Sequence, residues 1–277
     1  MEMSVFCCPI CGSPLKNEEK SLSCPSRHSF DKAAQGHVHL LPSNKMHAKI
    51  PGDNKEMVAA RKRFLEQGFY QPFRDEICRI VTEELKNSVA PILLDAGCGE
   101  GYYTAAILDS LKGAGINATV CGFDISKFAV KAAAVRNREL KLAVASCFSI
   151  PVADSSVDGL TAVFSPIVPA EFARVVKKGG FLLLAVAGER HLWGLKELLY
   201  EKPYLNEVKD TEYEGFRFEK RVPVRTKLAT EDNQTIRDLF AMTPYYWKTS
   251  VSGSKKIAQA KSLYTELGFD LLIYRRI

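Results

Sequence analysis

Four residues near the start of the chain have the types and spacing of a metal site. The pattern is C-x2-C-x12-C-x3-H, formed by Cys8, Cys11, Cys24 and His28. Each short-spaced pair can lie on one tight turn and supply two corners of a tetrahedron, and thiolates with an imidazole suit zinc. Four protein ligands leave no open position for water, so we expect structural rather than catalytic zinc. Cys7 is an alternative to Cys8, although only Cys8 has the two-residue spacing to Cys11.

A second group of residues has the pattern of a ligand-binding turn. The motif D-x-G-x-G-x-G follows the apolar run 92–94 and consists of Asp95, Gly97, Gly99 and Gly101. Such glycines let the backbone approach a ligand closely, and a following helix presents its free N–H groups at the same place. A dinucleotide-binding fold would need G-x-G-x-x-G, but Tyr102 or Thr104 holds the position of the third glycine. Asp124 follows the next apolar run, where an acid can accept both hydroxyls of a ribose.

The apolar pattern predicts the elements that must position these residues. Short apolar runs alternate with segments of helical character or length, at 92–94, 119–123, 142–145, 159–164 and 181–187. This alternation is typical of repeated βαβ units and predicts a parallel sheet with helices on both faces. We expect a further helix over 188–200 and strands over 216–228 and 269–274. Upstream, residues 53–86 are expected to form two helices around a loop that contains Tyr70.

Length, composition and charge set the class of the protein. The 277 residues suggest one large domain and a smaller one, and 46% hydrophobic with 25% charged residues is typical of a soluble globular chain. Membrane insertion and secretion are not expected, because no apolar run approaches about 20 residues and no signal sequence follows Met1. Four of the eight cysteines lie in the first 24 residues, which argues against a disulfide framework. Of the net charge of +6, +4 lies in residues 1–63.

The glycine turn resembles motif I of the class I S-adenosylmethionine-dependent methyltransferases. Asp124 and the later segments 147–152 and 156–158 match further landmarks of that family. The resemblance implies an α/β, Rossmann-like fold with a mostly parallel seven-stranded sheet, an antiparallel last strand and a small N-terminal zinc-binding domain. The expected boundaries are 1–40 for the zinc module, 41–88 for a basic helical arm and 89–277 for the methyltransferase domain.

The same resemblance implies how the chain holds its methyl donor, S-adenosylmethionine. The implied contacts are Asp95, Gly97, Gly99, Glu100 and Gly101 at the methionine end, Asp124 at the ribose, and Ser146 and Cys147 at the adenine.

Further motifs resemble those of the bacterial 23S ribosomal RNA (guanine-N1)-methyltransferases. They are Pro51-Gly52-Asp53, Ala60-Arg61-Lys62-Arg63-Phe64-Leu65, Gly68-Phe69-Tyr70-Gln71-Pro72, Cys98-Gly99-Glu100-Gly101-Tyr102-Tyr103, Arg190-His191-Leu192 and Met242-Thr243-Pro244. This resemblance implies methyl transfer to N1 of a guanine in a 23S hairpin, by a cytoplasmic homodimer whose zinc domains help to grip the RNA. Some family members protect bacteria against macrolides. The implied zinc ligands are Cys8, Cys11, Cys24 and His28, and the implied cofactor contacts include Tyr70, Gly99, Glu100 and His191.

The residues that would act on the RNA are less clearly indicated. Phosphate contact is expected from Arg61, Lys62 and Arg63 on a basic helix. The fourth strand of the sheet ends at Phe164-Ser165-Pro166-Ile167, where this fold places the methyl acceptor. Candidates for stacking on the guanine are Phe164, Tyr245, Tyr246 and Trp247.

No general base can be named from the sequence. Asp158 and Glu171 are carboxylates in the right half of the domain, but carboxylates at strand and helix ends are usually caps or solvated charges. Two other functions stay open on the residues alone. One is a small-molecule S-adenosylmethionine-dependent methyltransferase, and the other is a zinc-dependent RNA-binding adaptor with an inactive methyltransferase fold.

Overall fold

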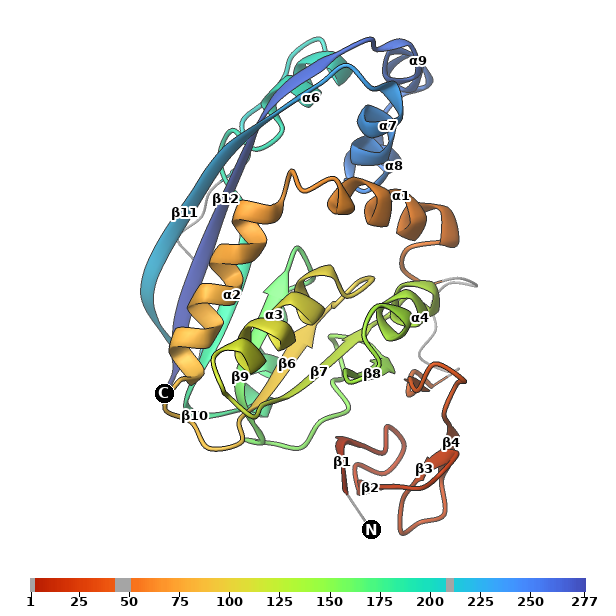
Figure 1. The fold of residues 1–277 in the computed structure, drawn as a ribbon, viewed down its shortest axis with the longest axis vertical. Helices are drawn as coiled ribbons and strands as arrows, with labels where there is room; N and C mark the ends of the chain where they lie inside the picture. Colours follow the sequence, from red (N-terminus) through yellow and green to blue (C-terminus); the bar gives the residue numbers. More distant parts are fainter. Residues whose placement is uncertain (1–2, 43–50, 208–211) are drawn as a thin grey trace.

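The computed structural model describes residues 3–42, 51–207 and 212–277, and within them the strands form two sheets (Figure 1). The smaller sheet is antiparallel and contains β1 (Met3–Cys7), β2 (Pro14–Asn17), β3 (Ser21–Ser23) and β4 (Ser29–Asp31). Part of the predicted arm, residues 43–50, lies outside the described residues.

The larger sheet has eight strands in the order β11-β12-β10-β9-β6-β7-β8-β5. Its strands are β5 (Val38–His39), β6 (Ile92–Ala96), β7 (Thr119–Asp124), β8 (Lys141–Val144), β9 (Val157–Val163), β10 (Val176–Ala187), β11 (Phe216–Thr230) and β12 (Leu263–Arg276). From β5 to β10 neighbouring strands are parallel, whereas β12 is antiparallel to both β10 and β11. The prediction of a mostly parallel sheet with an antiparallel last strand is confirmed.

The predicted number of seven strands is one too few for this sheet. The additional strand is β5, which follows the small sheet in the chain and pairs in parallel with β8 through Val38 and Ala143. Without β5, β8 would be the edge strand and would present unpaired N–H and C=O groups, and β5 pairs with some of them. Two residues of alternating burial carry too little pattern to be recognised as a strand from the sequence.

The helices pack on the faces of the larger sheet or against one another near the far end of its longest strands. They are α1 (Lys55–Glu66), α2 (Gln71–Leu85), α3 (Tyr102–Gly113), α4 (Lys127–Arg136), α5 (Pro169–Val175), α6 (Trp193–Leu199), α7 (Asn233–Ala241), α8 (Tyr245–Lys248) and α9 (Val251–Gln259). The two predicted helices around Tyr70 are α1 and α2. The helix expected over 188–200 begins later, at Trp193. No helix in the described ranges is long and apolar enough to cross a membrane.

Side chains that alternate along the central strands enter two different cores. Leu93 and Val120 pack in the core that contains residues of α1 to α4. Their neighbours Leu94 and Cys121 pack in a second core, together with α5 and the small N-terminal sheet, which contributes Phe6. Successive residues of a strand face opposite sides of a sheet, so strands buried on both faces are continuously apolar. The N-terminal module therefore covers part of one face of the sheet.

The longest strands, β11 and β12, form a ribbon that extends beyond the other strands and carries α6, α7 and α9 near its far end (Figure 1). Where the ribbon leaves the sheet, Gly188 donates its N–H to Gly268 O at 2.9 Å. This contact places residues 188–192 and Phe269 beside the carboxyl ends of the parallel strands. In open α/β sheets, ligands bind at that edge.

The close pairing of β9 with β10 generates a prediction about stability. A Cβ atom on Gly159 would lie 2.1 Å from Cε1 of the buried Phe181. We expect Gly159→Ala to lower the free energy of unfolding by about 1–3 kcal/mol, the usual cost of overpacking a core. Urea denaturation measures this change. Gly113→Ala is the matched control, since a Cβ there meets no atom within 4 Å, and equal effects of the two substitutions would contradict the prediction.

Candidate functional site

The four predicted zinc ligands lie together in the N-terminal module. One ligand atom from each of Cys8, Cys11, Cys24 and His28 can be chosen so that all lie within 4.8 Å of one another. The Sγ atoms of Cys11 and Cys24 are 3.7 Å apart, and Cys24 Sγ is 3.3 Å from His28 Nδ1. Two thiolates that bind one tetrahedral zinc ion at about 2.3 Å lie about 3.8 Å from each other, so this donor set fits zinc. Hydrogen bonding with Ser13 lowers the pKa of the Cys11 thiol to about 5, which favours the thiolate that a metal binds.

Cys7, the alternative ligand, faces a different part of the protein. Its N–H donates to Pro151 O at 2.8 Å, and the neighbouring Phe6 forms an antiparallel bridge with Val152. The zinc module is thus joined by main-chain hydrogen bonding to the loop that follows β8, the loop expected to line the adenine. Ser146 lies at the start of this loop, where its Oγ accepts from the N–H of Phe148 at 3.2 Å. Cys147 is buried, and burial raises the pKa of its thiol to about 12.

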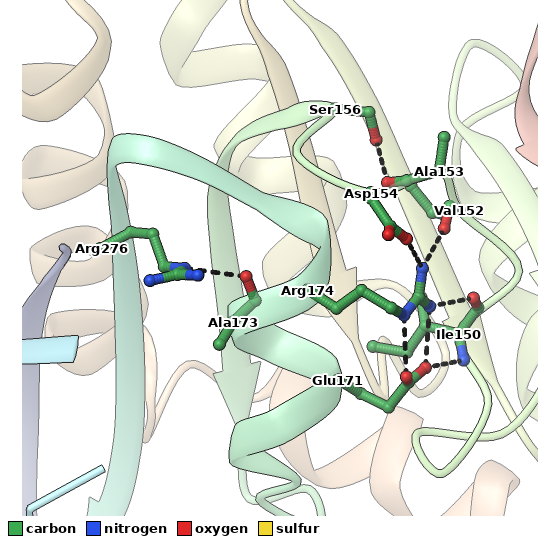
Figure 2. A network of polar contacts seen from close by, with 9 residues as sticks. All are labelled: Ile150, Val152, Ala153, Asp154, Ser156, Glu171, Ala173, Arg174 and Arg276. Carbon is green, nitrogen blue, oxygen red and sulfur yellow. Dashed lines mark hydrogen bonds and ion pairs between the residues drawn. The ribbon is translucent and has the colours of Figure 1, made fainter. Parts of the chain in front are cut away.

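Arg174 of α5 holds the same loop from another side (Figure 2). Its guanidinium donates to the carbonyl oxygens of Ile150 and Val152, each at 2.8 Å. It also pairs with the carboxylates of Glu171 and Asp154, each at 2.8 Å. Glu171 in turn accepts from the N–H of Ile150 at 2.7 Å. The adenine-side loop is therefore fixed between α5 and the zinc module.

These contacts bear on the two carboxylates considered as general bases. Glu171 is engaged by Arg174 and Ile150, and hydrogen bonding to Arg174 lowers its pKa. Asp158 accepts from the N–H of Ile92 at 2.8 Å and from Lys177 Nζ at 2.7 Å. Asp158 lies near the beginning of β9, and so at the edge of the sheet opposite the carboxyl ends of the parallel strands, where ligands bind. Both are structural groups, as their sequence positions suggested.

Asp95 joins the glycine turn to two other elements. Its carboxylate accepts from the hydroxyl of Thr104 in α3 at 2.5 Å and from that of Thr161 in β9 at 2.8 Å. The side chain is only 2% exposed, and burial raises its pKa to about 6. Asp95 therefore positions the turn that begins two residues later.

The three glycines of the turn all have left-handed backbone conformations, with φ of 81° at Gly97, 55° at Gly99 and 80° at Gly101. A Cβ on Gly97 would lie 2.4 Å from Ser165 Cβ, and one on Gly101 would lie 2.9 Å from Ala133 Cβ. These two glycines let the turn pack against its neighbours. Above Gly99 the nearest atom to such a Cβ is a guanidinium nitrogen of Arg61, at 3.8 Å, so the middle of the turn faces open space.

Two acids border this space. Asp124, at the end of β7, accepts from the N–H groups of Gly99 at 3.1 Å and Ser126 at 2.8 Å, and burial raises its pKa. Glu100 is 2% exposed, burial raises its pKa, and its Oε1 has no hydrogen-bond partner among the described residues. Buried polar atoms are nearly always hydrogen-bonded in native proteins. The unpartnered Glu100 oxygen thus points to a polar ligand, which the ammonium of S-adenosylmethionine would satisfy.

Tyr70 and His191, far apart in the sequence, meet over Phe269. The ring centroid of Phe269 lies 4.9 Å from that of Tyr70 and 4.6 Å from that of His191. Phe164 also belongs to this group: its ring centroid lies 6.4 Å from that of His191, at an interplanar angle of 14°, and 5.5 Å from that of Phe269. Nδ1 of His191 is buried and, in the described part of the chain, has no partner. The two predicted contacts thus belong to one aromatic group at the end of the parallel strands.

Sequence reasoning missed the residues that hold His191 in place. Lys196, fully buried, donates to Tyr204 O at 2.8 Å and to Asn206 Oδ1 at 2.6 Å. The amide of Asn206 then donates to the carbonyl oxygens of Gly188 and His191, at 2.8 and 3.2 Å. A lysine within a short amphipathic helix gives no signal of this role, because its burial depends on the distant segment around Asn206.

The basic residues expected to contact phosphate have different surroundings in α1. Arg63 pairs with Asp238 at 2.6 Å and Lys62 approaches Glu66 at 3.8 Å, and each of these two cations keeps 52% of its side chain exposed. Arg61 is only 22% exposed and pairs with Asp53 at 2.5 Å, beside the glycine turn. The group therefore does not act as one basic face.

Zinc binding can be tested with the two adjacent cysteines. We expect Cys8→Ser to reduce bound zinc well below one ion per chain and to lower the melting temperature, because a tetrahedral site loses a ligand. Metal analysis of the purified protein measures the zinc. Cys7→Ser is the control and should retain the ion. If zinc is lost with Cys7→Ser and retained with Cys8→Ser, the ligand assignment is wrong.

The buried His191 predicts a dependence of stability on pH. Burial, followed by the charges of Lys196 and Arg225, lowers its pKa to about 3, against about 6.5 when unfolded. At pH values between these two pKa values, His191 binds a proton in the unfolded state but not in the folded state. The contribution of His191 to stability is thus complete above about pH 6.5 and falls by up to about 1.4 kcal/mol per pH unit below it.

Replacing His191 isolates this contribution. Urea denaturation at pH 7.5, 6.5 and 5.5 should show the wild type losing more stability than His191→Gln as the pH falls. Asp95 has a raised pKa and acts in the opposite direction between about pH 4 and 6, but it is common to both proteins. Parallel curves for the two proteins would show that His191 titrates normally.

Comparison with known proteins agrees with both parts of this site. A zinc-ribbon family described as RlmA, N-terminal, matches residues 6–49, and a methyltransferase domain family matches residues 93–180. The YcgJ protein from Bacillus subtilis, a solved structure, superimposes with a TM-score of 0.50 at 16% identity over 73% of this chain and 98% of its own, which supports the fold. The matched domains confirm the predicted cofactors, S-adenosylmethionine and structural zinc.

Two relatives extend the comparison to the family. YxjB of Bacillus subtilis (strain 168), named as a 23S rRNA (guanine-N1)-methyltransferase, is 31% identical over 281 aligned residues, which cover 99% of this chain and 98% of YxjB. A protein of Micromonospora griseorubida with the same assignment is 34% identical over 69% of this chain and 68% of its own. The chain therefore belongs to the 23S rRNA (guanine-N1)-methyltransferase family, as an S-adenosylmethionine-dependent enzyme with an N-terminal zinc ribbon.

Proposed function

We propose that this protein transfers the methyl group of S-adenosylmethionine to N1 of a guanine in a hairpin of 23S ribosomal RNA. The observation that carries the proposal is the similarity to YxjB across 99% of the chain, which includes the zinc module as well as the methyltransferase domain. Small-molecule methylation would explain the second part but would give the zinc module no task.

The proposed cofactor site follows the carboxyl ends of the strands. Asp124 suits the ribose hydroxyls, the turn from Gly97 to Gly101 suits the methionine end, and the loop with Ser146 and Cys147 suits the adenine. Asp95 supports the turn from behind, through its bonds to Thr104 and Thr161. The described residues border this site with acids, and S-adenosylmethionine carries a positive sulfonium and a positive ammonium.

The target guanine must reach this site unpaired. Guanine N1 carries a proton that pairs in a duplex, so the enzyme acts on a loop base or extrudes one. Phe164 supports such a role, because it directly follows β9 with a left-handed φ of 55° and its side chain is 47% exposed. An aromatic ring that is both exposed and held against His191 can stack on a base. The sulfonium supplies the driving force for transfer, so alignment is the protein's main contribution.

The other aromatic candidates lie on α8. Trp247 is 68% and Tyr246 is 41% exposed, whereas Tyr245 is half-buried against Tyr200. The exposed pair suits contact with RNA outside the methyl-transfer site. We further propose a homodimer whose zinc modules help to grip the hairpin, action in the cytoplasm, and an effect of the methylation on macrolide susceptibility.

Labelling of RNA tests the proposed function. The protein is incubated with S-adenosylmethionine labelled in its methyl group and protein-free 23S ribosomal RNA, and the RNA is digested to nucleosides. We expect the label in N1-methylguanosine. A synthetic hairpin should accept the methyl group, and replacing its target guanine by adenine should abolish labelling. Cofactor binding without RNA labelling, or label at another base, would refute the proposal.

A further inference from the structure

Arg61 reaches from α1 into the space above the glycine turn. Its Nη1 lies 3.8 Å from the position of a Cβ on Gly99 and 2.5 Å from Oδ2 of Asp53. Its side chain is 22% exposed, less than half the 52% of Lys62 and Arg63 on the same helix. Arg61 thus faces the cofactor turn rather than the outer surface where RNA phosphates would lie.

The charges around Arg61 are acidic: Glu100 is buried, and Asp53 and Asp124 are partly buried. Burial alone would lower its pKa, but the charges of Asp53, Glu100 and Asp124 outweigh this effect, and the net shift is upward. Within the described ranges, Asp53 is the carboxylate paired with Arg61, through Nη1. A guanidinium has five N–H donors. Several donors of Arg61 are therefore available to a ligand in this space.

Asp53 holds Arg61 in this position. Its carbonyl oxygen accepts from the hydroxyl of Ser126, just after β7, at 2.5 Å. The preceding Gly52 has a φ of +70°, and a Cβ there would lie 2.7 Å from Ile125 Cγ2. The segment before α1 is therefore packed closely against the loop that follows Asp124, and the ion pair with Asp53 orients the guanidinium toward Gly99.

The amino-acid end of S-adenosylmethionine complements this arrangement, because it carries one carboxylate and one ammonium on the same carbon atom. The acids around Arg61 suit the ammonium and the sulfonium but would repel the carboxylate. The unpartnered Oε1 of Glu100 is an acceptor for the ammonium, and Arg61 is a donor for the carboxylate. We propose that Arg61 binds the α-carboxylate of S-adenosylmethionine while Glu100 receives its ammonium group.

This assignment rests on the cofactor site in the proposed function but not on the identity of the RNA. It also gives Arg61 a role different from that of its neighbours. Lys62 and Arg63 each keep 52% of the side chain exposed at the surface, although Arg63 pairs with Asp238, whereas Arg61 recognises the cofactor before any RNA is present.

The test compares two cofactors that differ by one carboxylate. Isothermal titration without RNA measures the affinity of S-adenosylmethionine and of decarboxylated S-adenosylmethionine for the wild type and for Arg61→Gln. We expect Arg61→Gln to weaken S-adenosylmethionine about 10-fold or more, the usual effect of losing a charge-assisted hydrogen bond, and to change the decarboxylated form less than about 3-fold. An equal loss for both cofactors, or no loss for either, would overturn the assignment.

Arg136→Gln is the matched control. Arg136 donates from Nε to the carbonyl oxygen of Glu100 at 3.1 Å, so its removal takes the same charge from the same turn. It should change both affinities by the same factor, and a loss confined to S-adenosylmethionine would assign the carboxylate to Arg136 instead.

Should Arg61→Gln fail to fold, Arg61→Lys keeps the charge and should show a smaller loss of affinity, still confined to the cofactor that carries the carboxylate. Failure of this test together with normal RNA labelling would refute only the role of Arg61.

Discussion

The site depends first on the buried carboxylate of Asp95 at the end of the central strand β6. A carboxylate taken out of water must be compensated by hydrogen bonds, and here the donors are Thr104 of α3 and Thr161 of β9. These bonds fix where β6 ends, how α3 begins and how β9 lies beside them. Gly97 and Gly101 of the turn can then pack against Ser165 and Ala133, because these two glycines have no side chains. Its N–H at Gly99 bonds to Asp124, which connects the turn to the next strand.

The zinc module is part of the methyltransferase domain's structure rather than an independent appendage. Phe6 enters the second core, β5 extends the large sheet, and the N–H of Cys7 bonds to Pro151. The last contact and the Arg174 network hold one loop between them, the loop proposed to line the adenine (Figure 2). A small sheet with little core of its own needs a metal to keep its shape. The zinc ion would thereby stabilise a surface on which the cofactor loop rests.

Charge is arranged to suit the cofactor. Glu100 is buried and Asp124 is partly buried beside the turn, where the cost of desolvation raises the pKa values of both carboxyl groups. Such acids are stabilised by a cationic ligand, and S-adenosylmethionine loses its sulfonium charge when the methyl group leaves. In the proposed assignment, Arg61 lies among these acids and supplies a positive group for the carboxylate.

The sequence by itself determined the zinc ligands' spacing, the glycine turn, Asp124 and the order of strands and helices, because these depend on residues close together in the chain. Local patterns could not show that β5 joins the large sheet, that Lys196 and Asn206 hold His191, or that Arg61 points toward Gly99 while Arg63 pairs with Asp238. Arg61 and Arg63 are two positions apart on one helix, and only the neighbours on each side distinguish them. The tertiary structure decided these roles, since burial and the partner of a charge are set by segments that are distant in sequence.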